Sequence, residues 1–446
     1  MPKLNVDFNS VSGKIRPLHS VGQPPWLGVD GKYLHYLTDA NIPYSRLHDM
    51  GGAYGGSIYV DIPNIFRDFD ADPENPDSYD FAFTDNLITK MYENKIEPIY
   101  RLGVTIENYI HIKRYFTFPP KDYQKWAKIC EMIIRHYNEG WADGFTYGIK
   151  YLEIWNEPDF HIYSLKDNMM WYGSPEQFYE LYDVSSKHLK NCFGDSIKVG
   201  GYGACGFYRI LSDPEKYGVH GKKNDNPGLL SEQKKGHMDF FHGFFEYIKK
   251  SGAPLDFFSW HSYASVEDTV IKAEYCEKML DEYGYGNAEI QLNEWNNAHH
   301  LEERGTSFAS AQTAAMMIAL HKTSRMNIMC YYDARLGPSV YGGLFNPLNH
   351  KPLCTYYSFA AFGELYVLGN CVKSECDGIY TIAATDGNGK NAVMIANTAD
   401  DAVIEAALGE SFKAYLVDEN NFLAEVPFDG KKINLNKNQV VLIKNY

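Results

Sequence analysis

The sequence lacks a long hydrophobic run and an excess of positive charge. Nowhere do about 18 apolar residues follow one another, the length that a membrane-spanning helix needs, and the first residues contain no apolar segment typical of an export signal. Lys and Arg number 42 against 57 Asp and Glu, a net charge of −15, whereas binding to nucleic acid requires clustered positive charge. We therefore expect no membrane and no nucleic-acid partner.

The eight cysteines form no Cys-x-x-Cys pair, and the sequence contains no Asn-x-Ser/Thr glycosylation site. Several cysteines stand inside apolar runs, as Cys330 does in residues 327–332, which favours buried and reduced thiols. Both observations are typical of an intracellular protein, and we expect a cytoplasmic location.

Motifs of several enzyme classes are missing as well. The sequence has no His-x-His and no His-Glu-x-x-His pattern, so we expect no metal site. No Gly-x-Ser-x-Gly motif indicates a serine hydrolase, and no Gly-x-Gly-x-x-Gly follows the first predicted strand. We expect the protein to work without a cofactor.

What the sequence does contain is an alternation of short apolar segments with longer stretches of helical periodicity. Eight segments are predicted to be strands: residues 16–22, 42–48, 96–102, 150–156, 198–202, 257–262, 289–294 and 327–333. The clearest predicted helices are residues 122–137, 175–192, 236–250, 268–283 and 307–324. Eight strand–helix units predict an α/β fold of the (β/α)8 TIM barrel type, with an open doubly wound sheet as the alternative.

The sequence changes character after about residue 366, where short alternating strands and turns such as residues 386–389 follow one another. Residues 4–8 also read as a strand. We predict a catalytic barrel over residues 14–365 and a smaller C-terminal β-sandwich domain made of residues 366–446 together with residues 1–13.

Two long loops are predicted on the face of the barrel where active sites lie, at residues 49–79 and 203–233. Loops of this length usually shape a substrate pocket, and we expect them to close one end of a cleft. Insertions without a role in substrate binding are the alternative.

Two glutamates stand at the ends of predicted strands. Glu157 is followed by Pro158, which cannot extend a strand, and Glu294 closes the segment at residues 289–294. Because strand ends meet at one rim of a barrel, we expect the two carboxyls to converge. Two carboxyls that flank a bond fit glycoside hydrolysis, although each glutamate alone is equally well explained as an ion-pair partner.

The motifs Trp155-Asn-Glu-Pro158 and Leu292-Asn-Glu-Trp-Asn296 resemble the acid/base and nucleophile signatures of glycoside hydrolase family 39, which includes β-xylosidases and α-L-iduronidases. This family belongs to a clan of retaining (β/α)8-barrel glycosidases with catalytic glutamates on strands 4 and 7. Residues 18–22, 45–48 and 260–263 are also similar to family strands. The resemblance spans most of residues 14–365 and implies that Glu157 is the general acid/base and Glu294 the nucleophile.

The resemblance also implies a set of side chains around the two glutamates: Asn156 for the sugar 2-hydroxyl, Arg46 and Tyr263 for holding Glu294, and His48 and His261 for other sugar hydroxyls. Barrel-filling side chains are the alternative for the arginine and the tyrosine. Satisfied core groups are the alternative for the histidines.

The segment at residues 331–338, where the last predicted barrel strand ends, departs from an ordinary β-xylosidase. Asp333 and Arg335 are candidate specificity residues there, because an arginine fork can bind a carboxylated sugar, but a salt bridge between the two is an equal alternative. Trp295 and Tyr332 belong to an aromatic stripe that can offer apolar faces to sugar C–H groups, with core packing as the alternative for part of it.

These observations together predict a retaining exo-glycosidase that removes terminal xylose-like or related pentose or hexose units from oligosaccharides by double displacement. Arabinosidase, galactosidase or uronidase specificity in another family of the clan is one alternative. A non-catalytic carbohydrate-binding protein on the same barrel is another. The sequence leaves open whether the chain forms a homo-oligomer.

Overall fold

The structure is a computed structural model of the 446-residue chain, described over residues 1–50, 60–105, 117–160, 170–208, 227–298, 300–337 and 339–446. Eight parallel strands close into a barrel in sequence order: β2 (Ser20–Gly22), β3 (Tyr44–Leu47), β4 (Glu97–Leu102), β5 (Tyr151–Ile154), β6 (Lys198–Ala204), β7 (Phe257–Ser262), β8 (Glu289–Trp295) and β9 (Ile328–Tyr331). The predicted (β/α)8 barrel is therefore confirmed, and each of the eight predicted strands overlaps one of these strands.

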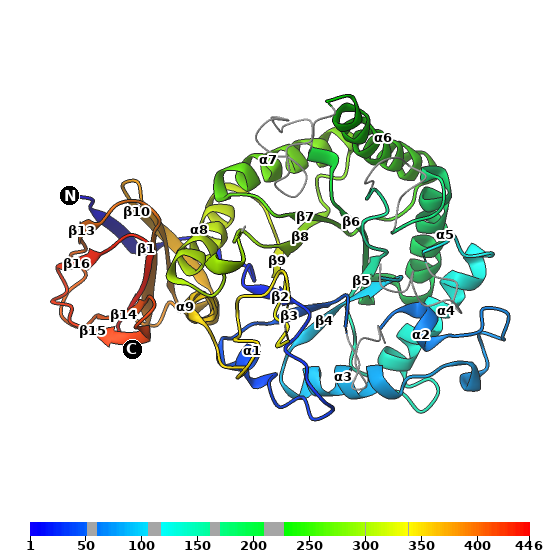
Figure 1. The fold of residues 1–446 in the computed structure, drawn as a ribbon, viewed down its shortest axis with the longest axis horizontal. Coiled ribbons are helices and arrows are strands. Elements are labelled where there is room, and N and C mark those ends of the chain that lie inside the picture. The colour runs from blue at the N-terminus through cyan, green and yellow to red at the C-terminus, as the bar shows by residue number, and fades with distance from the viewer. Residues whose placement is uncertain (51–59, 106–116, 161–169, 209–226, 299, 338) are drawn as a thin grey trace.

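Helices form a ring around the strands (Figure 1). They are α1 (His35–Asp39), α2 (Ile62–Ile65), α3 (Ala82–Glu93), α4 (Tyr123–Glu139), α5 (Pro175–Phe193), α6 (Pro227–Ser251), α7 (Val266–Tyr283), α8 (Ser307–Thr323) and α9 (Cys354–Leu368). Short 3-10 turns occur at Pro76–Ser78, Gly194–Ser196 and Leu301–Glu303. Among the described residues, no helix combines the length and the apolar character that a membrane crossing requires.

The predicted helices are confirmed, and α5 shows why its start was readable. Ser174 caps it by accepting a hydrogen bond from the Gln177 N–H, while the Gln177 side chain accepts one from the Ser174 N–H. Helix α6 begins at Pro227, nine residues before the predicted start, so the second predicted loop is shorter than residues 203–233. Residues 51–59 and 209–226 of the two loops lie outside the described residues.

The barrel interior changes from apolar to polar along its axis. Its amino end is closed by residues from the starts of the strands: Ile99, Tyr151, Phe257, Ile328 and Cys330. Above this layer the inward-facing side chains carry charges and amides, among them Arg46, Glu153 and Asn293, all fully buried. The polar layer lies at the carboxyl ends of the strands, where sites form in this fold.

The C-terminal part is a β-sandwich, as predicted. Its strands are β1 (Leu4–Lys14), β10 (Asn370–Cys376), β11 (Tyr380–Thr385), β12 (Asn391–Asn397), β13 (Ala402–Glu405), β14 (Lys413–Val417), β15 (Phe422–Val426), β16 (Lys432–Leu435) and β17 (Gln439–Lys444). Seven of them form one sheet in the order β1-β10-β11-β12-β17-β14-β15, and β13 pairs with β16. Residues alternate between two buried faces, because Val393 and Ile395 face the small sheet while Met394 belongs to the core shared with the barrel.

Strand β1 brings the start of the chain into this sheet. It runs antiparallel to β10, with Leu4 opposite Cys376 and Lys14 opposite Asn370. Both chain ends therefore lie in the sandwich (Figure 1).

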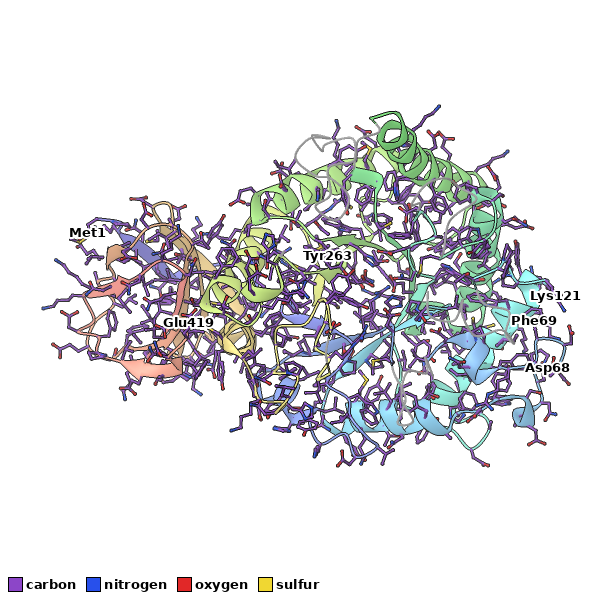
Figure 2. All side chains as sticks on the ribbon, in the orientation of Figure 1. Met1, Asp68, Phe69, Lys121, Tyr263 and Glu419 are labelled. Atoms are coloured by element: carbon purple, nitrogen blue, oxygen red, sulfur yellow. The ribbon has the colours of Figure 1, made fainter. Side chains whose placement is uncertain are left out.

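Helices α8 and α9 join the sandwich to the barrel. The Glu419 carboxylate accepts a 2.9 Å hydrogen bond from the Ser307 N–H at the start of α8, and Lys444 makes a 2.9 Å ion pair with Glu364 of α9. Glu419 lies between the two parts in Figure 2, whereas Tyr263 lies over the barrel.

Candidate active site

Glu157 follows β5 in an unusual backbone conformation. Trp155 and Glu157 have φ angles of 70° and 47°, a left-handed region that costs a residue with a side chain about 1–3 kcal/mol. Neighbouring strands stabilise the distortion, since the Trp155 N–H donates to the Leu102 carbonyl and the Glu157 N–H to the Tyr202 carbonyl. The conformation holds Asn156 and Glu157 at the barrel rim.

Glu294 reaches the same rim through a bulge in β8. Leu292 lies opposite Met329, but Trp295 lies opposite Tyr331, so one extra residue is inserted in β8 between these pairs. Strict alternation fails there, and the consecutive residues Asn293 and Glu294 both contact the polar network inside the barrel.

The two glutamates converge on His261. Its Nδ1 is 2.6 Å from Glu157 Oε1 and 3.5 Å from Glu294 Oε2. One side-chain oxygen of each glutamate and one nitrogen of His261 all lie within 4.8 Å of one another. Burial lowers the pKa of His261, and a neutral ring can accept a hydrogen bond from a protonated Glu157 or donate one to the ionised form.

Glu294 is held by both of its oxygens. Arg46 Nη1 is 2.7 Å from Oε1, the Tyr263 hydroxyl donates a 2.8 Å hydrogen bond to Oε2, and the residue is 5% exposed. Burial raises the pKa of Glu294, while His261 and Arg46 oppose the rise. The carboxylate is therefore fixed in one orientation in a mostly dry site.

Arg46 connects three groups at once. Its Nε is 2.6 Å from Glu153, and its Nη2 donates a 2.6 Å hydrogen bond to the Asn156 side-chain oxygen. The Asn156 NH₂ group is then the part of this amide that can donate to a sugar hydroxyl. Gly203, with φ of 67°, passes so close that a Cβ there would lie 3.3 Å from Asn156 Oδ1, so this position favours glycine.

A second chain of polar contacts lies beside Glu294. His48 Nε2 is 3.5 Å from Glu294 Oε1 and 3.3 Å from Asp49. The Tyr332 hydroxyl donates a 2.6 Å hydrogen bond to Asp49 and accepts one of 2.7 Å from Gln23. This chain brings the predicted residues His48 and Tyr332 to the site.

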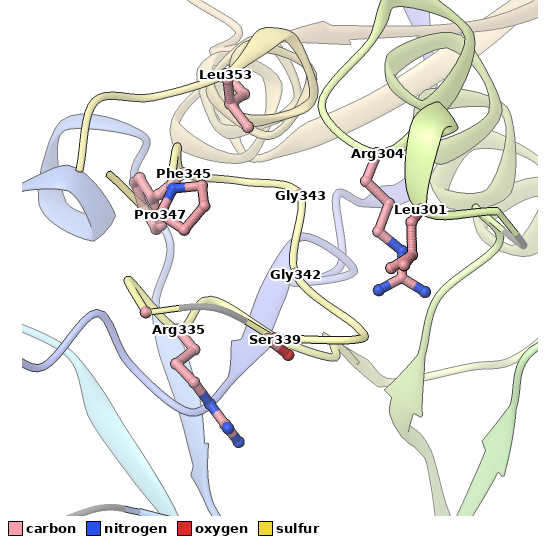
Figure 3. A pocket seen from close by; sticks show the side chains of 10 residues that line it. Leu301, Arg304, Arg335, Ser339, Gly342, Gly343, Phe345, Pro347 and Leu353 are labelled. Carbon is pink, nitrogen blue, oxygen red and sulfur yellow. The ribbon is translucent and has the colours of Figure 1, made fainter. Parts of the chain in front are cut away.

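A cavity of about 180 Å³ adjoins the site between the turn at Leu301–Glu303 and the segment after β9. Arg304 and Arg335 enter its lining from two sides, with Ser339 between them (Figure 3). Arg335 also donates hydrogen bonds of 2.9 and 2.7 Å to the Gln23 side-chain oxygen, which connects the cavity to the Tyr332 chain.

The family follows from a comparison with known proteins. A sequence model of glycosyl hydrolases family 39 matches residues 52–309, which is more than half of the chain. The protein belongs to glycosyl hydrolases family 39.

Two relatives carry the name β-xylosidase. The one from Geobacillus stearothermophilus is 22% identical over 276 residues, 57% of this chain and 46% of the relative, and the one from Caldicellulosiruptor saccharolyticus is 24% identical over 243 residues, 50% and 41%. The match thus spans less than half the length of either relative.

Solved structures share the fold over the whole chain. A glucosidase from Croceicoccus marinus superposes with a TM-score of 0.76 at 19% identity, covering 100% of this chain and 98% of that one. A monomeric β-xylosidase from Caulobacter crescentus gives a TM-score of 0.67 at 14% identity, covering 99% and 98%.

Two predicted substrate contacts of this family 39 protein are corrected by the structure. Trp295 is fully buried and packs against Tyr331 and against Phe359 of α9, because the bulge in β8 turns it to the outside of the barrel. Asp333 is also fully buried, and it accepts hydrogen bonds from the Arg335 N–H and the Ser339 hydroxyl. It shapes the loop, and Arg335 lies 3.7 Å from it, in addition to its bonds with Gln23.

Sequence reasoning missed several residues of the site. Glu153, Gln23, Asp49 and Gly203 take part in the networks above, and the Tyr341 ring lies 5.1 Å from Tyr263 and 5.2 Å from Tyr332. The single charged residue within the apolar strand at Tyr151–Ile154 was a usable signal for Glu153. The other four carry no signal beyond residue type.

Potential metal ligands cluster in three places within the described ranges: Glu131, His188 and Cys192; Asp159, Cys205 and His237; and Glu157, His261 and Glu294. In the last group the oxygens of Glu294 are bound by Arg46 and Tyr263, so this group is poorly suited to hold a cation. The expected lack of a metal stays a prediction.

Proposed function

We propose that this protein is a retaining glycoside hydrolase that releases a terminal neutral sugar of xylose type. One observation carries the proposal, namely the separation of at most 4.8 Å between an oxygen of Glu157 and an oxygen of Glu294. Double displacement uses carboxyls about 5–5.5 Å apart, whereas inversion needs roughly 6.5–9.5 Å to admit a water molecule.

In the first step Glu294 attacks the anomeric carbon and Glu157 protonates the departing oxygen. The bond from the carbon to the leaving group breaks, a bond to the Glu294 oxygen forms, and the leaving group departs as an alcohol. Arg46 and Tyr263 support this step by holding the attacking carboxylate in one orientation.

In the second step a water molecule replaces Glu294 on the sugar. Glu157, now ionised, takes a proton from the water, the new carbon–oxygen bond forms, and the Glu294 carboxylate is released. The contact of 2.6 Å with His261 suits both protonation states of Glu157. The sugar keeps its anomeric configuration because the carbon is attacked twice.

The preference for a neutral sugar is supported by the charges around the site. Arg46 is paired with Glu153 and Glu294, and two nitrogens of Arg335 are bonded to Gln23. Asp49 adds a further carboxylate at the rim. A uronic acid would therefore meet an Arg46 that already pairs with two carboxylates, and the Asp49 carboxylate near it. The two relatives named β-xylosidase support a pentose.

Exo action on oligosaccharides is part of the proposal. It rests on the long loops after β3 and β6, parts of which lie outside the described residues. The hydrogen-bonded chain from Asp49 through Tyr332 to Gln23 gives the rim a fixed wall on the side of Glu294.

Proton NMR of the first-formed sugar tests the mechanism, and a panel of aryl glycosides of xylose, arabinose, galactose, glucose and uronic acids tests the sugar. We expect retention of configuration and fastest hydrolysis of the xyloside. An inverted product would refute the nucleophile role of Glu294. Binding of sugars without hydrolysis of any glycoside would favour a carbohydrate-binding protein instead.

A further inference from the structure

Glu153 is a fully buried carboxylate that lies directly behind Arg46 in the barrel interior. Its Oε2 is 2.6 Å from Arg46 Nε, and its Oε1 accepts hydrogen bonds of 2.6 Å from the Ser259 hydroxyl and from the Asn293 amide. These neighbours come from β3, β7 and β8, so Glu153 on β5 connects four strands just below the catalytic carboxyls.

Glu153 is ionised in this position. Burial alone raises the pKa of a carboxyl, but the attraction and the hydrogen bond of Arg46 outweigh it, and the pKa of Glu153 lies below its ordinary value. Arg46 therefore stands between two carboxylates, Glu153 at Nε and Glu294 at Nη1. One positive charge faces two negative charges when Glu294 is ionised.

We propose that Glu153 is a positioning residue of the catalytic reaction, which acts on Glu294 through the guanidinium that the two carboxylates share. The inference rests on the proposed function, because a nucleophilic Glu294 is what gives the shared guanidinium a catalytic role. With Glu153 in place, Arg46 orients Glu294 without fully neutralising it, so the carboxylate stays reactive. The extra negative charge also stabilises the positive charge that develops on the sugar in the transition state.

The ionisation of Glu294 depends on every charged or titratable side chain that faces it. Among the described residues, these groups are Arg46, His48 and Asp49 from the end of β3, Glu157 after β5, His261 and Tyr263 from the end of β7, Cys330 of β9, and Tyr332 and Tyr341 after β9. Glu153 differs from them because it lies on the far side of the Arg46 guanidinium. Removing its charge leaves Arg46 attracting Glu294 more strongly, which lowers the pKa of Glu294.

The variant Glu153→Gln removes the charge and keeps the shape. Its amide can bond to the Ser259 oxygen, and Asn293 can turn its own amide so that Oδ1, which has no hydrogen-bond partner in the described structure, accepts the second N–H. We expect the acid limb of kcat/KM to move lower by about one pH unit, the order of effect of a nearby buried charge. We expect kcat on the plateau to fall about 10²-fold.

Two further variants separate charge from structure. Ser259→Ala removes a hydrogen bond to Glu153 but no charge, and Glu153→Asp keeps the charge on a shorter side chain. Both are expected to keep the acid limb at the wild-type pH whatever they do to kcat. An unmoved limb in Glu153→Gln, or a limb that drops equally in Glu153→Asp or Ser259→Ala, overturns the proposal.

The wild-type protein is tested first with an activated 2-deoxy-2-fluoro glycoside, and mass spectrometry of peptides locates the trapped sugar. Trapping on Glu294 establishes the nucleophile independently of Glu153. If the wild type neither hydrolyses glycosides nor is trapped, the proposed function fails. If the wild type is trapped and Glu153→Gln is trapped at the same rate at every pH, the role of Glu153 alone fails.

Discussion

The carboxyl end of the barrel and the interior of the β-sandwich are both shielded from water, but they contain opposite kinds of side chain. Within the described residues, the barrel holds six charged residues that are fully buried: Arg46, Asp61, Arg101, Glu153, Asp159 and Asp333. The sandwich packs apolar residues of its large sheet against those of its small sheet: Val393, Ile395, Val441 and Ile443 against Ile404 and Leu435. The first region holds the polar groups of the candidate site, and the second contributes apolar packing that stabilises the fold.

The difference follows from the free energy of burial. Each apolar side chain removed from water stabilises the fold by about 25 cal/mol per Å² of surface. A buried ion pair returns little net stability, because the desolvation of two charges offsets their attraction. The polar layer of the barrel is therefore supported by the apolar shell between its strands and helices and by the sandwich.

The largest effect on activity is expected from Glu294→Gln. The variant keeps the shape of the side chain but removes the attacking carboxylate, so kcat should fall about 10⁴-fold or more. Arg46 keeps its partner Glu153, and circular dichroism should show an unchanged fold. A kcat near that of the wild type on a good substrate would remove Glu294 from the mechanism.

A smaller and substrate-dependent loss is expected from Glu157→Gln. Hydrolysis of glycosides with poor leaving groups should slow by about 10²–10⁴-fold, because the leaving oxygen is no longer protonated. Dinitrophenyl glycosides need no protonation, so their first step should slow far less, and added azide should restore turnover in the second. An equal loss on both kinds of substrate would contradict the acid/base role.

In the sandwich, Ile395→Ala should change stability and leave catalysis alone. The side chain is fully buried in β12, and its truncation should lower the free energy of unfolding by about 2–5 kcal/mol. Val403, 41% exposed in β13, provides a control whose replacement by Ala should cost less than about 0.5 kcal/mol. Urea denaturation measures both free energies of unfolding. A shifted pH profile of activity in Ile395→Ala would contradict the claim that the sandwich affects stability alone.

The smallest effect concerns the pH dependence of the wild type. Burial raises the pKa of Glu294 above its ordinary value of 4.5, and the carboxyl must be ionised to attack. Activity should therefore be lost as the pH falls through this raised pKa, about tenfold per pH unit below it. A profile of kcat/KM against pH with an acid limb below 4.5 would contradict the dry environment of Glu294.

Much of the fold could be predicted from the sequence because the barrel strands are apolar runs with clear ends. Helix α9 was missed because nearly all of its faces are buried, which removes the amphipathic period that reveals a helix. Strands β13 and β16 were missed because they are four residues long and half exposed. Short polar strands resemble loops until their partners are known.

The convergence of Glu157 and Glu294 was predictable from local motifs, but their surroundings were not. A bulge cannot be read from alternation, so the outward turn of Trp295 was missed, together with the contact of Asn293 with the polar network inside the barrel. Arg46 and Glu153 are separated by 107 positions in the chain, and their contact depends on how neighbouring strands align. Sequence patterns indicate which residues lie on a strand. Which side chain each of them contacts across the barrel depends on how the sheet closes.

The pairing of β1 with β10 has a consequence for how the protein is made. Residues 4–14 are synthesised before their partner at residues 370–376, which leaves the ribosome about 20–70 s later at ordinary elongation rates of 5–20 residues per second. During that time the barrel can assemble while an extended, unpaired edge waits at its start. An unpaired strand of this kind can be bound by a chaperone that shields exposed strands. We expect a tag fused ahead of Leu4 to lower the yield of folded protein.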